Sequence, residues 1–456
     1  MRKSVVPTAR VAALKVLLQG SGREGFAQDL LDVALEESEL SPPDRRLATQ
    51  LVYGTLRRRG TIDALLRQAI HREPENVEAW IWESLRLGVF QLLYLDQVPA
   101  YAAIHETVEL AQRLEMPRAK GFINGILRKV ASWIAADRTD APAANAVPLR
   151  DNQYRQLAEP RLPDPKRQPV EYIADAFSLP AWLAARWLDR FGWDESVRLG
   201  FWFAEPAPIY LRVNTLKTDR DAMLGALSHA GVQAEPGRHP QSIRLLEPTP
   251  IRDLPGYADG MFVVQDESAM HLASALNPQP GMRVLDLCAA PGGKTTHLAE
   301  LMKNEGEIIA SDLDEFRLDL AMQSCERLGI SIVSPHAMTP ETSLPEGPFD
   351  GILVDVPCSN TGVLGRRAEA RWRLKPGDIR RLVPQQTQLL TEACRRVKPG
   401  GLVVYSTCSI EPEENFAVVE SVRKAFPEMR FDGEEESIPG KPSDGGYWAR
   451  LRRKQT

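Results

Sequence analysis

The spacing of hydrophobic residues changes along the chain and predicts different structures for its two ends. From about residue 8 to 135, hydrophobic residues recur at helical spacing, as in WIWESLRLGVFQLLYL and GFINGILRKVASWI. Almost nothing there alternates as a β-strand does, so we expect an all-helical domain over residues 1–136. Ser41 followed by PPDRR is typical of a helix start, because a serine oxygen can cap the helix and proline suits its first turn.

A basic cluster, Arg57, Arg58 and Arg59, should lie at the end of the helix that starts near Ser41. The C-terminus of a helix favours cations facing solvent, and a basic cluster also suits contact with phosphate groups. The sequence leaves both interpretations open.

The middle of the chain predicts a linker and a small mixed domain. Residues 137–168 are rich in Pro and Ala without a sustained period, which indicates a linker. Over residues 169–262, PIYLRVNTLKT, SIRLLE and GMFVVQD read as strands, and DRDAMLGALSHAG reads as a helix. We therefore expect a compact α+β subdomain over residues 169–262.

From about residue 280, strands and helices alternate. The expected strands are MRVLDLCA, EIIASD, SIVSPHA, FDGILVDVP and GLVVYSTC, with helices between them. Such alternation predicts a parallel sheet with helices on both faces. The ending, with MRFDGEE and GGYWARLRR, indicates an antiparallel pair at one edge. The sequence thus predicts a multidomain protein whose last domain, residues 263–456, has an α/β, Rossmann-like fold.

Composition narrows the classes of protein. The 456 residues carry a formal net charge of −5, which argues against a protein that is basic throughout but leaves a local nucleic-acid face open. No run approaches the roughly 18 apolar residues of a membrane span, and no signal-peptide core is present. We expect a cytosolic protein without membrane contact. Five scattered cysteines without a CxxC pattern indicate reduced thiols and no zinc site.

A glycine loop joins the first strand of the α/β domain to its first helix in LDLCAAPGGKTTHLAE. Small residues let the backbone approach a ligand, and the helix start offers N–H groups. The first glycine of a P-loop would fall on Cys288, which argues against a triphosphate cradle. Asp312, at the end of the next strand, suits a ribose diol. The loop and the acid indicate an adenosine-bearing cofactor, although a ligand-free turn and a helix N-cap at Asp312 remain alternatives.

Two cysteines should meet at the same edge of this sheet. Asp355 and Cys358 follow one strand, and Cys408 follows the next. The carboxyl ends of neighbouring parallel strands point to one edge, so both sulfur atoms are expected in one crevice beside an acid. The alternative is two buried structural cysteines. Lys294 and Asp355 would bias a thiol pKa in opposite directions.

These groups suit one reaction on a pyrimidine. A thiolate that adds to carbon 6 makes carbon 5 nucleophilic toward an electrophilic methyl group. An acid at nitrogen 3 would stabilise the adduct, and a base would remove the carbon 5 proton so that the thiolate can leave.

The chain resembles the NOL/NOP/Sun family of RNA 5-methylcytosine methyltransferases, which use S-adenosyl-L-methionine and a Rossmann-like class I methyltransferase domain. The matching motifs are CAAPGGK (288–294), DVPCSNTG (355–362), STCSIEPEEN (406–415), RVNTLKT (212–218) and VVQDESAM (263–270). Residues 8–135 resemble the RNA-binding domain of transcription antitermination factor B, NusB.

The resemblance implies roles for individual residues. Cys408 would be the nucleophile, Cys358 would act on the carbon 5 proton, and Asp355 would contact the cytosine and the methionine end of the cofactor. Lys294 belongs to the same catalytic set. The cofactor would be wrapped by a loop and held at its ribose by Asp312; the loop consists of Cys288, Ala289, Ala290, Pro291, Gly292, Gly293 and Lys294. No metal is implied.

One departure from the family concerns the adenine. Family members usually carry an acidic residue after the third strand, but this chain has SPHAMTPE there, with His336, Ala337 and Met338. We expect backbone groups to hold the adenine and the affinity for the cofactor to be reduced.

The expected function is methylation of a cytosine in small-subunit (16S) ribosomal RNA. The target should be unpaired or flipped out, because stacking shields a paired base. The first alternative is a ribosome-assembly or antitermination factor that binds RNA without turnover. Methylation of DNA or of a free nucleotide is disfavoured, since the helical domain and the small subdomain would have no purpose there. We expect a monomer.

Overall fold

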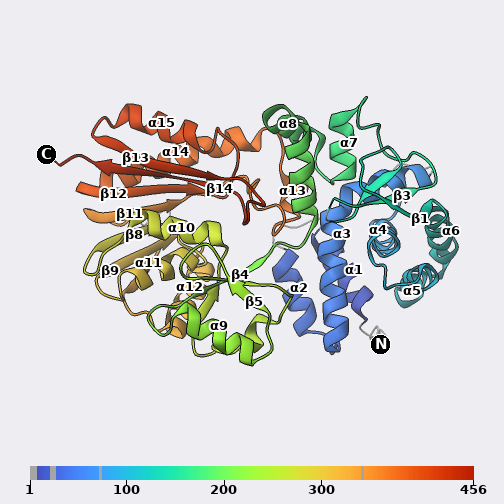
Figure 1. Ribbon diagram of the computed structural model, residues 1–456, viewed down its shortest axis with the longest axis horizontal. Helices are drawn as coiled ribbons and strands as arrows, with labels where there is room; N and C mark the ends of the chain where they lie inside the picture. The colour runs from blue at the N-terminus through green and yellow to red at the C-terminus, as the bar shows by residue number, and fades with distance from the viewer. Residues whose placement is uncertain (1–7, 21–26, 71–73, 151, 340–343, 456) are drawn as a thin grey trace. The chain divides into compact units, whose positions relative to one another are not determined.

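The computed structural model describes residues 8–20, 27–70, 74–150, 152–339 and 344–455, and the chain forms two compact units. The first, the helical unit, comprises residues 1–206 and 364–374. The second, the sheet unit, comprises residues 207–363 and 375–456. Figure 1 traces the elements of each unit.

The first part of the helical unit is all-helical, as predicted. Its helices are α1 (Ala9–Gly20), α2 (Ala27–Glu36), α3 (Pro42–Ala69), α4 (Ala79–Tyr94), α5 (Ala100–Arg113) and α6 (Lys120–Ala131). Ser41 caps α3, because its hydroxyl accepts a hydrogen bond from the Asp44 N–H (3.4 Å). Leucines such as Leu51, Leu85 and Leu127 are fully buried and form the core of this helical part.

The segment predicted as a linker contains a small sheet instead. Its strands are β1 (Ile134–Thr139), β2 (Ala146–Pro148) and β3 (Tyr154–Leu157), in the antiparallel order β1-β3-β2. Val147, Tyr154 and Leu157 are buried there. Strands of three to six residues are too short to show a clear period, which is why composition alone suggested a linker over residues 137–168.

The helices that follow also correct a predicted boundary. The segments α7 (Pro169–Ala176) and α8 (Ala181–Ala204) pack within the helical unit, whereas the strands predicted for the small α+β subdomain lie in the sheet unit. The helix α8 is interrupted at Gly192, whose φ of 76° is in the left-handed region.

The three arginines Arg57, Arg58 and Arg59 lie inside α3, not at its end. Arg58 donates to the Pro148 carbonyl (3.1 Å) and lies 4.8 Å from the centre of the Tyr94 ring. Burial lowers the pKa of Arg57 to about 10 and also lowers that of Arg58. These guanidinium groups are used for internal packing, which argues against a phosphate site at this cluster.

One segment from the C-terminal half of the sequence, residues 364–374, lies in the helical unit. It contains the short helix α13 (Ala370–Arg373). The fully buried Arg371 guanidinium donates to the carbonyls of Ser178 (3.2 Å) and Phe203 (2.9 Å). The domain predicted over residues 263–456 is therefore interrupted by residues that pack elsewhere.

The sheet unit begins with a small antiparallel sheet in the order β5-β6-β4-β7. Its strands are β4 (Ile209–Val213), β5 (Ala234–Pro236), β6 (Ser242–Leu245) and β7 (Phe262–Val264), and its helix is α9 (Arg220–His229). Leu211, Leu227 and Phe262 are fully buried in its core. The strands predicted in PIYLRVNTLKT, SIRLLE and GMFVVQD are confirmed.

The large sheet has the order β10-β9-β8-β11-β12-β14-β13. Its strands are β8 (Arg283–Leu287), β9 (Glu307–Asp312), β10 (Val333–Ala337), β11 (Phe349–Asp355), β12 (Val397–Thr407), β13 (Met429–Ser437) and β14 (Gly446–Arg453). The first five are parallel, and β13 and β14 form the predicted antiparallel edge pair. Strand order reverses between β8 and β11, where doubly wound folds bind ligands at the carboxyl ends of the strands.

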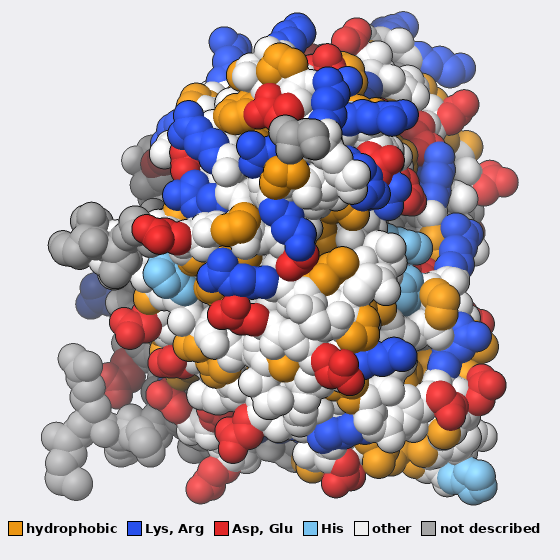
Figure 2. Space-filling view, turned by 90° about the vertical axis from the view of Figure 1, so that its left-hand side faces the viewer, with side chains coloured by type: hydrophobic (Ala, Val, Ile, Leu, Met, Phe, Trp, Pro, Cys, Tyr) orange, Lys and Arg blue, Asp and Glu red, His pale blue; other side chains and the backbone are white. Residues whose placement is uncertain are grey.

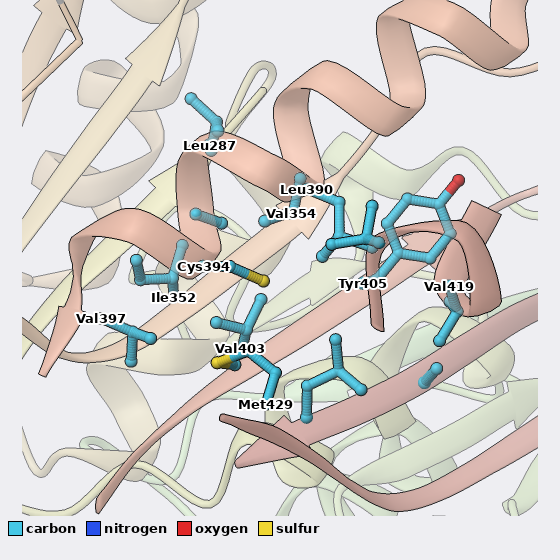
Figure 3. Packing of buried hydrophobic residues seen from close by; sticks show 14 of the residues in the cluster. Leu287, Ile352, Val354, Leu390, Cys394, Val397, Val403, Tyr405, Val419 and Met429 are labelled. Atoms are coloured by element: carbon cyan, nitrogen blue, oxygen red, sulfur yellow. The ribbon is translucent and has the colours of Figure 1, made fainter. Parts of the chain in front are cut away.

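Helices cover both faces of this sheet, as Figure 1 shows, which confirms the Rossmann-like prediction. One face carries α10 (Glu267–Leu276), α11 (Gly293–Leu301) and α12 (Glu315–Leu328), and the other carries α14 (Asp378–Arg396) and α15 (Phe416–Ala425). Figure 3 shows the second interface, where Val354 and Tyr405 of the sheet pack with Leu390 and Val419 of the helices.

A buried ion pair joins the sheet β5-β6-β4-β7 to α11 of the large sheet. Arg212 of β4 donates to both carboxylate oxygens of Glu300 in α11, at 2.8 and 3.2 Å. Both side chains are fully buried, and Arg212 also donates to Thr296 Oγ1 (2.9 Å) and to the Gly293 carbonyl (2.6 Å). This network fixes the start of α11, which follows the glycine loop.

Candidate active site

The glycine loop connects β8 to α11 in a tight turn. Cys288 has a φ of 68° and Gly292 a φ of 93°, both in the left-handed region. A Cβ atom at Gly292 would lie 2.5 Å from Cβ of Ala321, so this position requires glycine. Below the loop, Thr295 donates to Asp286 (2.6 Å), and burial raises the pKa of Asp286 to about 7.

Asp312, at the carboxyl end of β9, faces the glycine loop. Its carboxylate accepts the N–H of Ala290 (2.9 Å) and the N–H of Asp314 (3.1 Å). The N-cap of α12 is Asp314, which accepts the Arg317 N–H (3.0 Å). The N-cap interpretation of Asp312 is therefore wrong, because the capping role belongs to its neighbour, and a ribose contact by Asp312 stays a prediction.

Lys294, at the start of α11, forms an ion pair with Asp355, at the end of β11. The distance between Lys294 Nζ and Asp355 Oδ2 is 2.6 Å, and about a quarter of each side chain is exposed. Burial alone would lower the pKa of Lys294, but the Asp355 carboxylate outweighs it and the pKa is raised. Ser406 donates to the other oxygen of Asp355 (2.8 Å). The sequence placed these two charges near the thiols but did not predict that they bind each other.

The thiols of Cys358 and Cys408 are in direct contact, with their sulfur atoms 2.8 Å apart. They follow β11 and β12, which are neighbouring parallel strands, as predicted. The hydrogen bond with Cys408 and burial raise the pKa of Cys358 well above its usual value. Cys358 therefore keeps its proton at neutral pH while Cys408 remains as its partner.

Asn360 connects the two cysteine loops. It occupies the left-handed region with a φ of 61°, its amide donates to the Cys358 carbonyl (2.9 Å), and its side-chain oxygen accepts from the Cys408 thiol (3.2 Å). The N–H of Gly362 also donates to the Cys408 carbonyl (2.9 Å). The sequence did not predict these contacts of Asn360, although Asn is the residue type that best tolerates this conformation after Gly.

The remaining thiols are packed differently. Cys325 and Cys394 are 1% exposed in the hydrophobic cores on the two faces of the sheet. Burial raises the pKa of Cys325 to about 11 and that of Cys394 to about 12. Burial and the nearby Asp312 carboxylate raise the pKa of Cys288 as well. Cys325 and Cys394 are therefore buried structural thiols, whereas Cys358 and Cys408 are partly exposed.

The acidic run after Cys408 is buried, not exposed at a helix start. Glu411, Glu414 and Asn415 are at most 2% exposed, and α15 begins only at Phe416. Asn415 accepts from Thr407 (2.6 Å) and donates to the Ser409 carbonyl (3.0 Å), which fixes the turn around Cys408. The sequence signal for these residues was weak, because acids before a helix are ordinarily solvated.

The segment that lacks the family's acidic residue runs from the end of β10 into Met338. The Met338 N–H donates to the Asp312 carbonyl (2.8 Å), so this backbone donor is engaged within the protein. Pro340 and Glu341 of the same motif lie outside the described residues.

In the described ranges, no group of three His, Cys, Asp or Glu side chains could hold a metal ion. Every helix in the described part of the chain falls short of the length and apolar character that a membrane span requires. Figure 2 shows a face on which Lys and Arg side chains are numerous toward the top and mixed with Asp and Glu.

The residues at this edge fit a cofactor with a ribose and a zwitterionic end. Asp312 supplies acceptors for hydroxyl groups beside a loop whose backbone can approach closely. Lys294 and Asp355 offer opposite charges for an amino group and a carboxylate. An adenosyl amino acid has both features.

Comparisons with known proteins cover nearly the whole chain. A family model described as "16S rRNA methyltransferase RsmB/F" matches residues 273–440, the NusB family model matches residues 7–132, and an RsmF/B-like ferredoxin-like domain matches residues 179–252. The chain is 34% identical to the probable ribosomal RNA small subunit methyltransferase B of Bacillus subtilis (strain 168), covering 95% of this chain and 91% of that one.

Two further similarities extend over the same length. The chain is 36% identical to the protein of that description from Synechocystis sp., covering 95% of this chain and 92% of that one. The crystal structure of PH0851 superposes with a TM-score of 0.80 at 26% identity, covering 98% of both chains. The all-helical part, the sheet β5-β6-β4-β7 and the large sheet therefore recur together in another protein.

Proposed function

The chain belongs to the RsmB/F family of 16S rRNA methyltransferases, and we propose that it methylates carbon 5 of a cytosine in small-subunit ribosomal RNA through a covalent cysteine adduct. The observation that carries the proposal is the contact between the thiols of Cys358 and Cys408 beside the Asp355 carboxylate. Two thiols and one carboxylate are the groups that addition to carbon 6 and proton removal from carbon 5 require.

The cofactor would be S-adenosyl-L-methionine, which supplies an electrophilic methyl group when bound. The loop from Cys288 to Lys294 would enclose it, Asp312 would accept hydrogen bonds from its ribose hydroxyls, and Lys294 and Asp355 would hold its methionine end. The Arg212 network holds the start of α11 and so keeps this loop in place.

The proposed chemistry assigns one step to each side chain. Cys408 first gives its thiol proton to solvent and then forms a bond from its sulfur to carbon 6. The displaced electron pair moves to nitrogen 3, which takes a proton from the carboxylic acid form of Asp355 and returns it when Cys408 leaves. Carbon 5 then takes the methyl group. Finally, Cys358 removes the carbon 5 proton, the bond between Cys408 and carbon 6 breaks, and Cys408 leaves as a thiolate.

The thiol contact explains how Cys358 changes from acid to base. Its pKa is raised first of all by the hydrogen bond with Cys408. Once Cys408 is bound to carbon 6, its sulfur is a neutral thioether and no longer raises that pKa. Cys358 can then lose its proton to solvent and accept the proton from carbon 5.

The substrate should be 16S rRNA with the target cytosine unpaired or flipped out, because stacking shields carbons 5 and 6 of a paired base from the thiols. The NusB-type helices and the ferredoxin-like small sheet are proposed as the RNA-binding parts. We propose a monomer that acts in the cytoplasm.

A second candidate function is an RNA-binding assembly factor without turnover. The segment Ser334–Met338 favours it, because it carries no acidic residue at the place where the family resemblance implies an acid for the adenine. Calorimetry with S-adenosyl-L-methionine separates the two candidates: cofactor binding supports the enzyme, and no binding supports the factor.

The deciding experiment is methyl transfer to naked 16S RNA, followed by nucleoside mass spectrometry. We expect 5-methylcytidine from the wild-type protein, none from Cys408→Ser, and full yield from the matched control Cys325→Ala, whose thiol lies in the core. A methyl group on another base, or full activity of Cys408→Ser, would overturn the proposal.

A further inference from the structure

Glu414 is a fully buried acid that touches both cysteine loops. Its carboxylate accepts the Ser359 N–H (2.9 Å), the Ser359 hydroxyl and the Ser409 hydroxyl (2.6 Å). Ser359 directly follows Cys358, and Ser409 directly follows Cys408. One carboxylate thus receives hydrogen bonds from the residue next to each thiol.

We propose that Glu414 is a positioning residue that holds the two cysteine loops together and so sets the contact between Cys358 and Cys408. The inference rests on the proposed function for its role in methyl transfer. Its structural part, the effect on the two thiols, can be measured without any turnover.

Glu414 is the shared acceptor of the polar groups that surround the two cysteine loops. The hydroxyls of Ser359 and Ser409 lie 3.1 Å apart, and both need an acceptor. Gln386 of α14 donates to Glu414 (2.9 Å) and to the Pro357 carbonyl (3.0 Å), which extends the contact to the residue before Cys358. A carboxylate accepts at up to four sites and donates none, which matches these four donors.

Glu414 is itself held in place from the sheet. The hydroxyl of Tyr405, a fully buried residue of β12, donates to the Glu414 carbonyl (2.6 Å). This hydrogen bond ties the chain between Cys408 and Glu414 to β12, the strand that Cys408 follows. Movement of Glu414 would disturb both loops at once, because its side chain lies between them.

The negative charge of Glu414 has a second effect, on the pKa of a thiol, which packing alone would not produce. The negative charge of Glu414 contributes to the raised pKa of Cys358, after the hydrogen bond with Cys408, burial and the charge of Cys408. Replacement of Glu414 by Gln keeps the shape and removes the charge. The Cys358 thiol should then ionise at lower pH, while Lys294 and Asp355 remain unchanged.

The test compares Glu414→Gln with wild type and with Glu420→Gln, a control on the partly exposed face of α15 that pairs with Arg423. In Glu414→Gln we expect kcat to fall on the order of 10²-fold, with KM for RNA and cofactor within about threefold, because misplacement of reacting groups acts on the chemical step. Iodoacetamide labelling of Cys358, followed by peptide mass spectrometry, should show its pH midpoint moved to lower pH. Glu420→Gln should match wild type.

The outcomes separate the proposals. An unchanged labelling profile and normal kcat in folded Glu414→Gln would overturn the positioning role. A lower melting temperature with normal labelling would reduce Glu414 to a stabilising residue and equally overturn the positioning role.

If wild type makes no 5-methylcytidine, the proposed function fails, but labelling still decides the role of Glu414. If Glu414→Gln does not fold, Ser409→Ala, which removes one donor, is measured in its place with the same expected loss in kcat.

Discussion

The sulfur atoms of Cys358 and Cys408 lie 2.8 Å apart although 50 positions separate them in the sequence. Parallel pairing of β11 with β12 brings the ends of the two strands together, and the loops beyond them complete the approach. At this distance one thiol can donate a hydrogen bond to the other, and because the Cys408 thiol donates to Asn360, Cys358 is the donor that remains for the contact.

This contact predicts that Cys358→Ala traps the RNA. Without the thiol that removes the carbon 5 proton, the bond between Cys408 and carbon 6 should persist after methyl transfer. We expect a protein–RNA adduct that resists denaturant on a gel, and turnover reduced by about 10²-fold or more. The double variant with Cys408→Ser should form no adduct. Normal turnover of Cys358→Ala without an adduct would remove Cys358 from the mechanism.

Asp312 and Asp314 allow a matched test of cofactor binding. Asp312→Ala removes the acceptor beside the glycine loop, and we expect the dissociation constant for S-adenosyl-L-methionine to rise about tenfold or more. Asp314→Ala removes the N-cap of α12 and should cost about 1 kcal/mol of stability while leaving the affinity near the wild-type value. Calorimetry and thermal melting check both. Equal affinities for the two variants would contradict the assignment of Asp312.

Lys294→Met should weaken cofactor binding more than RNA binding. The change leaves the Asp355 carboxylate without the ammonium group 2.6 Å away, so the charge that holds a cofactor carboxylate is lost. Because the pair is about a quarter exposed, we expect a moderate effect, on the order of tenfold in KM for the cofactor. Lys424→Met, on the exposed side of α15, is the control. A larger change in KM for RNA than for the cofactor would argue against this role.

Much of the sheet unit could be predicted because its signals are local. The strand ends at Asp312, Asp355 and Cys408 follow from hydrophobic runs that stop at polar residues, and parallel topology places such ends at one edge. The sequence therefore predicted both sulfur atoms in one crevice, but neither their direct contact nor the pairing of Lys294 with Asp355. A preference for one ionic partner depends on side-chain geometry that spacing does not contain.

What the sequence missed depends on contacts between distant segments. Nothing local shows that Arg371 packs in the helical unit, since its buried guanidinium bonds carbonyls from separate parts of the chain. Arg58 was missed for the same reason. Glu414 looked like a solvated acid because the Ser359 donors that bury it lie 55 positions away. Buried polar groups of this kind become visible only when their partners are assembled.

Asp286 predicts a pH dependence of stability. Its pKa is about 7 in the folded protein, well above the usual range of an aspartate, so the folded state binds a proton that the unfolded state releases between about pH 4 and 7. The free energy of unfolding should therefore fall by about 2–4 kcal/mol as pH rises through this window. Above pH 8 the contribution of Asp286 should be nearly constant. Asp286→Asn should remove this part of the dependence. Melting curves of both proteins from pH 4 to 8 that stay parallel would contradict the prediction.

The buried pair of Arg212 and Glu300 predicts an unequal result for single and double replacements. Arg212→Met leaves a fully buried carboxylate without its guanidinium, which ordinarily costs about 3–5 kcal/mol. The double variant with Glu300→Leu removes both charges and should recover much of that loss, because desolvation of the two ions is avoided. Recovered stability need not restore activity, since Arg212 also bonds the Gly293 carbonyl at the glycine loop. We therefore expect the double variant to melt near the wild-type temperature and yet to bind the cofactor more weakly. A double variant no more stable than Arg212→Met would show that the pair acts through shape rather than charge.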